Sequence, residues 1–344
     1  MVEGHGVSAS MRFSCSIPSF LMLLTLGLAT LSPSPVYADR SPPPSTLPAD
    51  VEKQQKFARL WEQRFDRDVS AEILPLIDDP ELDFAQRAVR ALGRLENPTV
   101  LAELERRRGE QQAQIKEGLA DFSKLPKRLL QLDTAIARIQ SRNLHGQEKI
   151  EFVTERMPLK WNWQQAIEWS RKVSNPKNYL TISPAAAQIR EIVDLLYVMA
   201  RNGEDIGPLR RQFTFTTAQD VQLDAASLSR AEEAEHLLDY SQTLDIVSLD
   251  DEYVCESHFL SLGDVARTAL KNRLLLLLQT KPHFAHRFPL ACMLRAAAMT
   301  GDMSLLPIVQ GIAIELTYVP YTQNDAGNAE IKLKSKTAFP FAPQ

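Results

Sequence analysis

Apolar and polar positions along the chain follow a helical period over most of its length. Between residues 51 and 317, apolar side chains recur three or four positions apart, and Ile189, Val193 and Tyr197 illustrate one such apolar side. This pattern predicts an all-α protein. The predicted helices span residues 51–65, 73–77, 83–92, 97–122, 125–142, 147–157, 163–173, 184–200, 227–243, 251–260, 264–279, 288–299 and 302–318.

One stretch departs from the helical period. In residues 209–223, the run Phe213-Thr-Phe-Thr-Thr alternates apolar and polar positions, which is typical of a β-strand. We therefore expect a loop or a short strand in this stretch, between two helical parts of the chain.

The first 38 residues have the pattern of a secretory signal peptide. A short, positively charged start precedes a mostly apolar run at residues 20–29, and Val36-Tyr37-Ala38 places small residues before Asp39. The apolar run is too short for a membrane span of about 20 residues, which disfavours an uncleaved anchor. The sequence thus predicts a periplasmic or secreted protein.

Composition and charge exclude several classes of protein. The 344 residues carry 39 Lys and Arg against 43 Asp and Glu, a net charge of −4 that argues against a nucleic-acid partner. An apolar fraction of 44% excludes a wholly disordered chain, and three cysteines are too few for a disulfide scaffold. The apolar stretch Leu274–Leu278 is too short to cross a membrane, so no span is expected after signal cleavage.

These patterns divide the chain into segments. A run that contains four prolines and no aromatic residue follows the signal and predicts an extended tether. The expected segments are a signal peptide at 1–38, a tether at 39–50, N-terminal helices at 51–122, a helical middle region at 123–254, C-terminal helices at 255–322 and a polar tail at 323–344.

The segment 73–107 combines signals for a pair of closely packed helices. Asp79-Pro80 ends its first helix, Asp83 is expected to cap the second, and small alanines allow neighbouring helices to approach. Ala88 and Leu92 share the apolar stripe, so both are expected at a helix–helix interface. Asn97-Pro98 then caps the next helix.

Related segments occur further along the chain. The segment RAAAMTGDMSLLPIV (Arg295–Val309) aligns with RALGRLENPTVLAEL (Arg90–Leu104) without a gap, and Ser261–Leu270 is a weaker copy. Gly263 and Gly301 hold equivalent places in the last two copies. Such segments resemble HEAT repeats of the bacterial lyase-type subclass. This resemblance implies an α-solenoid of helical hairpins with a concave protein-binding face and a less regular middle region; the alternative is an irregular helical bundle.

Two clusters of side chains could carry chemistry or binding. Trp161, Trp163 and Trp169 lie close together in the sequence, as in sugar-binding surfaces, although burial is the more common reason for such a cluster. The histidines at 258, 283 and 286 lack the further ligands of a familiar zinc spacing, so no metal site is predicted. No sequence motif of a catalytic or cofactor site is present, so no catalytic residue or cofactor is predicted.

Cys255 and Cys292 are the two thiols left after signal cleavage. An oxidising compartment favours a disulfide between them. However, they hold nearly equivalent positions in adjacent repeats, and such positions usually point the same way rather than toward each other. We therefore expect two buried, free cysteines, with the disulfide as the alternative.

These observations favour an exported, non-catalytic scaffold that binds another envelope protein. This function follows from the resemblance to HEAT repeats and not from composition. The alternative is an envelope carbohydrate-binding protein or hydrolase that uses the Trp161–Trp169 segment. Burial or exposure of these rings separates the two hypotheses, and the sequence contains no signal for the oligomeric state.

The signal peptide generates a direct prediction. Cleavage after Ala38 makes Asp39 the first residue of the mature protein, whether translation starts at Met1 or at Met11. N-terminal sequencing of the protein from its native envelope should therefore begin at Asp39. An intact Met1 or Met11 on a cytoplasmic protein would contradict export.

Overall fold

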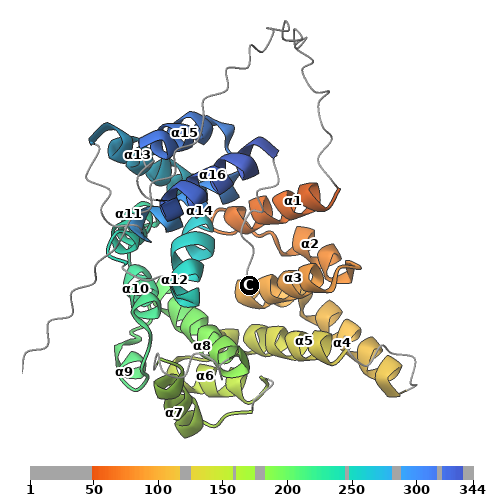
Figure 1. Cartoon of the computed structure of the whole chain (residues 1–344). Helices are drawn as coiled ribbons and strands as arrows, with labels where there is room; N and C mark the ends of the chain where they lie inside the picture. The colour runs from red at the N-terminus through yellow and green to blue at the C-terminus, as the bar shows by residue number, and fades with distance from the viewer. Residues whose placement is uncertain are drawn as a thin grey trace, which may run out of the picture. The chain divides into compact units, whose positions relative to one another are not determined.

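A computed structural model describes residues 49–116, 125–157, 160–174, 183–244, 248–280, 288–315 and 320–335. The described helices belong to one compact unit. Within the described ranges every regular element is a helix, so the predicted all-α class is confirmed (Figure 1). The predicted signal peptide and nearly all of the tether lie outside these ranges.

The helices follow the predicted pattern closely in most of the chain, and Trp163–Val173 agrees with the prediction at both ends. The elements are α1 (Ala49–Gln63), α2 (Ser70–Ile73), η1 (Leu74–Asp78), α3 (Leu82–Leu95), η2 (Pro98–Val100), α4 (Leu101–Lys116), α5 (Leu125–Gln140), η3 (Ser141–Asn143), α6 (Gly146–Thr154), α7 (Trp163–Val173), α8 (Ser183–Arg201), α9 (Gly207–Arg210), α10 (Thr217–Ala225), α11 (Arg230–Ser241), α12 (Leu249–Glu252), the π-helix η5 (Tyr253–His258), α13 (Asp264–Thr280), α14 (Phe288–Thr300), η6 (Met303–Leu305), α15 (Leu306–Glu315) and α16 (Pro320–Ser335).

Two segments aligned in the sequence also have the same local structure. Glu96 has a left-handed backbone (φ 50°), and the side chain of Asn97 accepts a hydrogen bond from a backbone N–H before a 3₁₀ turn and α4. At the aligned positions, Gly301 is left-handed (φ 64°) and Asp302 caps a 3₁₀ turn before α15. The alignment therefore matches a repeated turn, with the same cap and the same change of direction.

Three expectations need correction. The helix α3 begins after Glu81, so Asp83 lies in its first turn and is not its cap. The stretch 209–223 forms no strand, because Thr216 caps α10 through a capping box and draws the following residues into a helix. The predicted polar tail is wrong over residues 323–335, which belong to the helix α16 (Pro320–Ser335), with Ala326, Ala329 and Leu333 buried.

The helices α3 and α5 approach each other closely. Ala88 and Leu92 of α3 have no exposed surface, which confirms their predicted place at an interface. Gly93 lies against the backbone of α5, and a Cβ at this position would stand 2.8 Å from Cα of Ala135. Only glycine leaves the two backbones room to lie this close.

The first helix contacts elements that are far away in the sequence. Glu62 pairs with Arg267 of α13 at 2.6 Å, across 205 residues, and Asp66 pairs with Arg230 of α11 at 2.8 Å. Helices that are neighbours in the sequence, such as α4 and α5 or α15 and α16, also pack together. The solenoid stacking stays a prediction, and these contacts join α1 and the turn after it to α13 and α11.

The close approach of α3 and α5 generates a stability prediction. Gly93→Ala should lower the free energy of unfolding by about 1–3 kcal/mol, because the new methyl group clashes with backbone that cannot rotate away. Gly109→Ala, in the helix α4, is the matched control. A Cβ there meets nothing within 4 Å, so the free energy of unfolding of this variant should rise by about 0.5–1 kcal/mol. Urea denaturation measures both, and equal stability of the two variants would contradict the packing.

Candidate functional site

A cavity of about 420 Å³ lies where α1, α3, α8 and η5 meet. Three arginines line it: Arg64 directly after α1, Arg94 in α3 and Arg201 at the end of α8. We call this cavity the arginine cleft. Its aromatic lining consists of Trp61, Phe65, Tyr197 and Tyr253.

The π-helix η5 supplies one wall of the arginine cleft. Tyr253, Ser257 and His258 all line the cavity, and Ser261 follows in the turn before α13. A π-helix holds more residues in each turn than an α-helix and occurs frequently at functional sites. The wide turn brings these three side chains of one short segment to the cavity.

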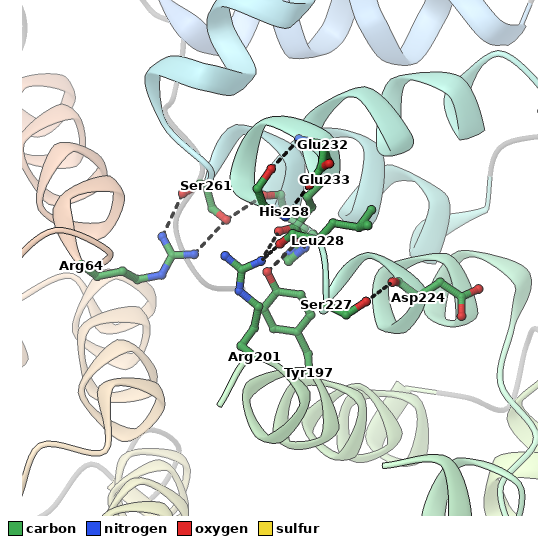
Figure 2. Close-up of polar contacts among 11 residues, drawn as sticks. Arg64, Tyr197, Arg201, Asp224, Ser227, Leu228, Glu232, Glu233, His258 and Ser261 are labelled. Carbon is green, nitrogen blue, oxygen red and sulfur yellow. Dashed lines mark hydrogen bonds and ion pairs between the residues drawn. The ribbon is translucent and has the colours of Figure 1, made fainter. Parts of the chain in front are cut away.

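Behind this wall, the carboxylate of Glu233 in α11 organises a buried network. Glu233 has no exposed surface and accepts hydrogen bonds from Tyr197 (2.8 Å) and Arg201 (3.0 Å), while the ring nitrogen Nε2 of His258 lies 2.9 Å away (Figure 2). Burial, together with the nearby Glu233, raises the pKa of Tyr197 well above its usual value. The network joins α8, α11 and η5 around one negative charge.

A second buried carboxylate, Asp194, also lines the cleft. It forms an ion pair with Arg94 and lies within 3.4 Å of the hydroxyl group of Tyr253. Burial disfavours the charged form of Arg94, but the carboxylates of Asp194 and Glu191 outweigh this effect and raise its pKa. Burial, and then the charge of Asp194, raises the pKa of Tyr253 to about 12. Arg94 and Tyr253 are therefore held in their charged and neutral forms, respectively, at neutral pH.

Arg64 differs from the other two arginines of the cleft because its contacts are to neutral oxygens. Its Nη1 donates to the carbonyl of Trp61 (2.7 Å). Nη1 also donates to the carbonyl of Ser261 (2.8 Å), and Nη2 donates to Oγ of Ser261 (3.2 Å) (Figure 2). Among the residues that the structure describes, no carboxylate is recorded in an ion pair with Arg64. Burial lowers its pKa to about 10, so it stays protonated at neutral pH.

The tryptophans identified in the sequence lie elsewhere and are largely buried. Trp161 stacks on Trp169 with a centroid distance of 5.8 Å, and Trp163 meets Phe213 edge to face at 5.0 Å. Trp161 and Trp163 are only 6% and 7% exposed, and Trp169 is half-buried. These rings form part of the core around α7 and α8, which counts against a sugar-binding platform.

Cys255 and Cys292 are both free and buried, as expected. They do not point away from each other, because both belong to one buried cluster with Leu244. The neighbouring Cys292 thiol, together with burial, raises the pKa of Cys255. Cys255 lies in the π-helix η5, and Cys292 lies in α14.

The histidines show no metal site in the part of the chain that the structure covers. His258 belongs to the Glu233 network, whereas His283 and His286 lie outside the described residues. No group of three or more His, Cys, Asp or Glu side chains in the described ranges is placed to hold a metal ion. Among the same ranges, no helix is both long and apolar enough to cross a membrane.

The sequence pattern did not predict the arginine cleft or the carboxylates that build it. One signal for them was available: Asp194 interrupts the apolar run from Ile192 to Val198, and Glu233 lies beside the buried positions Ala234 and Leu237. A charged side chain on an apolar stripe must find a partner in the interior. The identity of that partner depends on which helices meet, and the stripe does not contain this information.

Comparisons with protein-family models, with curated proteins and with solved structures find no match to this chain. The functional argument therefore rests on the geometry of the arginine cleft.

The Glu233 network generates a stability prediction. Glu233→Gln removes the negative charge beside Arg201 and should lower the free energy of unfolding by about 3 kcal/mol, because it leaves a cation without its buried partner. Glu232→Gln is the matched control, since Glu232 is exposed and glutamine can keep its capping box with Ser229. Urea denaturation at neutral pH compares the two variants. A Glu233→Gln variant as stable as the Glu232→Gln variant would show that the network does not hold these helices together.

Proposed function

We propose that this protein is an exported, non-catalytic scaffold that binds another envelope protein through the arginine cleft. The observation that carries the proposal is the lining of the cleft, where arginine, tryptophan and tyrosine side chains gather around one open cavity of about 420 Å³. These three residue types dominate the binding energy of protein interfaces. A side chain or a chain end of a partner would fit a cavity of this size.

The hydrogen bonds around the cleft support binding rather than acid–base chemistry. Glu233 is held by Tyr197, Arg201 and His258, and Asp194 is held by Arg94. Because these side chains form hydrogen bonds and ion pairs with one another, they make a rigid, preorganised wall. Such a wall lowers the entropy cost of binding a partner.

The remaining parts of the proposal come from the sequence. The signal peptide supports an envelope location, and the HEAT-like segments support a role in protein binding. The repeated turn at Glu96 and Gly301 agrees with this resemblance. The carbohydrate-binding alternative loses its main argument, because Trp161 and Trp163 are buried.

Asn202 offers a test of the proposal because it lies at the cleft and is exposed. Asn202→Trp should block the cleft without disturbing the core. Asn143→Trp, at an exposed position of η3, is the matched control. Each mature variant is used to isolate partners from the native envelope, and the purified partner is then titrated directly.

The proposal expects one partner that binds the wild-type protein and the Asn143→Trp variant with similar affinity. The Asn202→Trp variant should bind the same partner at least about tenfold more weakly, as expected when a hot-spot residue is displaced. Equal affinity of the two variants, or the absence of any partner that distinguishes them, would contradict docking at the arginine cleft.

A further inference from the structure

We propose that the group bound in the arginine cleft is a carboxylate, held by the free edge of the Arg64 guanidinium. This inference rests on the proposed function, because it names the chemistry of the group that the partner places in the cleft. It assigns the binding contact to one side chain and is therefore open to a specific test.

Two aromatic rings contact the guanidinium of Arg64. It lies 4.2 Å from the ring centre of Trp61 and 3.8 Å from that of Phe65. Both stacking contacts fix the plane of the charged group. A planar donor with a fixed orientation loses little entropy when a ligand binds to it.

The hydrogen bonds of Arg64 leave one edge unused. A guanidinium has five N–H bonds. The contacts with Trp61 and Ser261 employ both N–H bonds of Nη1 and one of Nη2. The two that remain, on Nε and Nη2, lie side by side along one edge. No contact to this edge is recorded from any residue that the structure describes.

Charge balance indicates that the missing partner is an anion. The carboxylates around the cleft are already paired: Glu96 with Lys149 at 2.6 Å, and Asp194 with Arg94. Glu233 forms an ion pair with Arg201. The positive charge of Arg64 therefore has no counter-charge of its own, and leaving a largely desolvated cation without one is costly.

A second side chain of the cleft has an unused donor. The side chain of Arg94 is only 7% exposed, and its Nε is buried without a hydrogen-bond partner among the described residues. Because Arg94 also lines the cavity, the cleft contains unused donors on two arginines. An acceptor from outside the chain would satisfy donors of this kind.

The geometry favours a carboxylate over a phosphate. Two parallel N–H bonds on one edge match the two oxygens of a carboxylate in the bidentate arrangement. A phosphate monoester carries nearly two negative charges at neutral pH, whereas the cleft has one unpaired cation. The aromatic lining further favours a carboxylate attached to an apolar or aromatic group.

Phenylacetate and phenylacetamide are suitable probes, since they share the aromatic ring and differ in the carboxylate. Isothermal titration calorimetry of the mature protein measures the affinity for each probe. The NMR signal of the Trp61 indole N–H is the local reporter of binding. We expect phenylacetate to bind about 10- to 100-fold more tightly than phenylacetamide, as a charged hydrogen-bonded pair requires. This comparison uses the wild-type protein and does not depend on the folding of any variant.

Three variants assign the contact to Arg64. Arg64→Gln should weaken phenylacetate binding by at least about tenfold and leave phenylacetamide unchanged. Arg64→Lys keeps the charge but loses the two parallel N–H donors. Its affinity for phenylacetate should therefore fall between those of the wild-type protein and Arg64→Gln. Arg59→Gln, at an exposed position of α1, is the matched control and should bind as the wild-type protein does.

Peptides distinguish the two sources of the carboxylate. If a partner chain supplies it, a peptide that ends in phenylalanine with a free carboxylate should bind more tightly than phenylacetate, and its amidated form should bind poorly. If a free organic acid supplies the carboxylate, the peptide should bind no more tightly than phenylacetate. Either result supports a carboxylate site. Equal binding of phenylacetate and phenylacetamide, no binding of phenylacetate, or an unchanged affinity in Arg64→Gln would overturn it.

The two proposals can fail separately. If phenylacetate binds through Arg64 but Asn202→Trp loses no partner, the carboxylate site stands and the scaffold function fails. If a partner depends on the open cleft but binds Arg64→Gln as well as the wild-type protein, the scaffold function stands and the carboxylate site fails.

Discussion

The carboxylate of Glu233 has no contact with solvent, so its charge must be compensated by the protein itself. Tyr197 and Arg201 approach it from α8, and His258 approaches it from η5 (Figure 2). These contacts fix α8, α11 and η5 relative to one another, since moving any one of them would leave a buried charge unpaired. The back wall of the arginine cleft depends on this single interaction.

Arg64, which lines the cleft from the end of α1, is stabilised in a different way. Arg64 reaches from the end of α1 to the turn at Ser261, 197 residues further along the chain, and forms hydrogen bonds to neutral oxygens instead of an ion pair. The carboxylates Asp194 and Glu233 are paired with cations, whereas Arg64 is recorded in no ion pair with a described residue. This contrast, between charges that stabilise the fold and one without an ion pair, supports the binding function that we propose for the cavity.

Local signals in the sequence were sufficient for most of the secondary structure. The apolar period predicted α7 and α8 within one residue at each end, and the gap-free alignment of Arg90–Leu104 with Arg295–Val309 agrees with the shared turn at Glu96 and Gly301. Caps and left-handed residues act over a few positions, so a linear sequence displays them directly. The errors occurred where packing outweighed local composition: α16 is polar overall, but Ala326, Ala329 and Leu333 give it an apolar side that α14 and α15 cover.

The sequence by itself determined the all-α class, most helix positions and the repeated turn, because each depends on neighbouring residues. Export stays a prediction. The sequence also places the charges of Asp194 and Glu233 among apolar positions. Only the tertiary structure decided which cations meet them, that the two thiols share one buried cluster, and that Arg64 keeps an unused edge. These features join segments up to about two hundred residues apart. Pairing of charges in three dimensions depends on how the helices pack, and no local pattern encodes that arrangement.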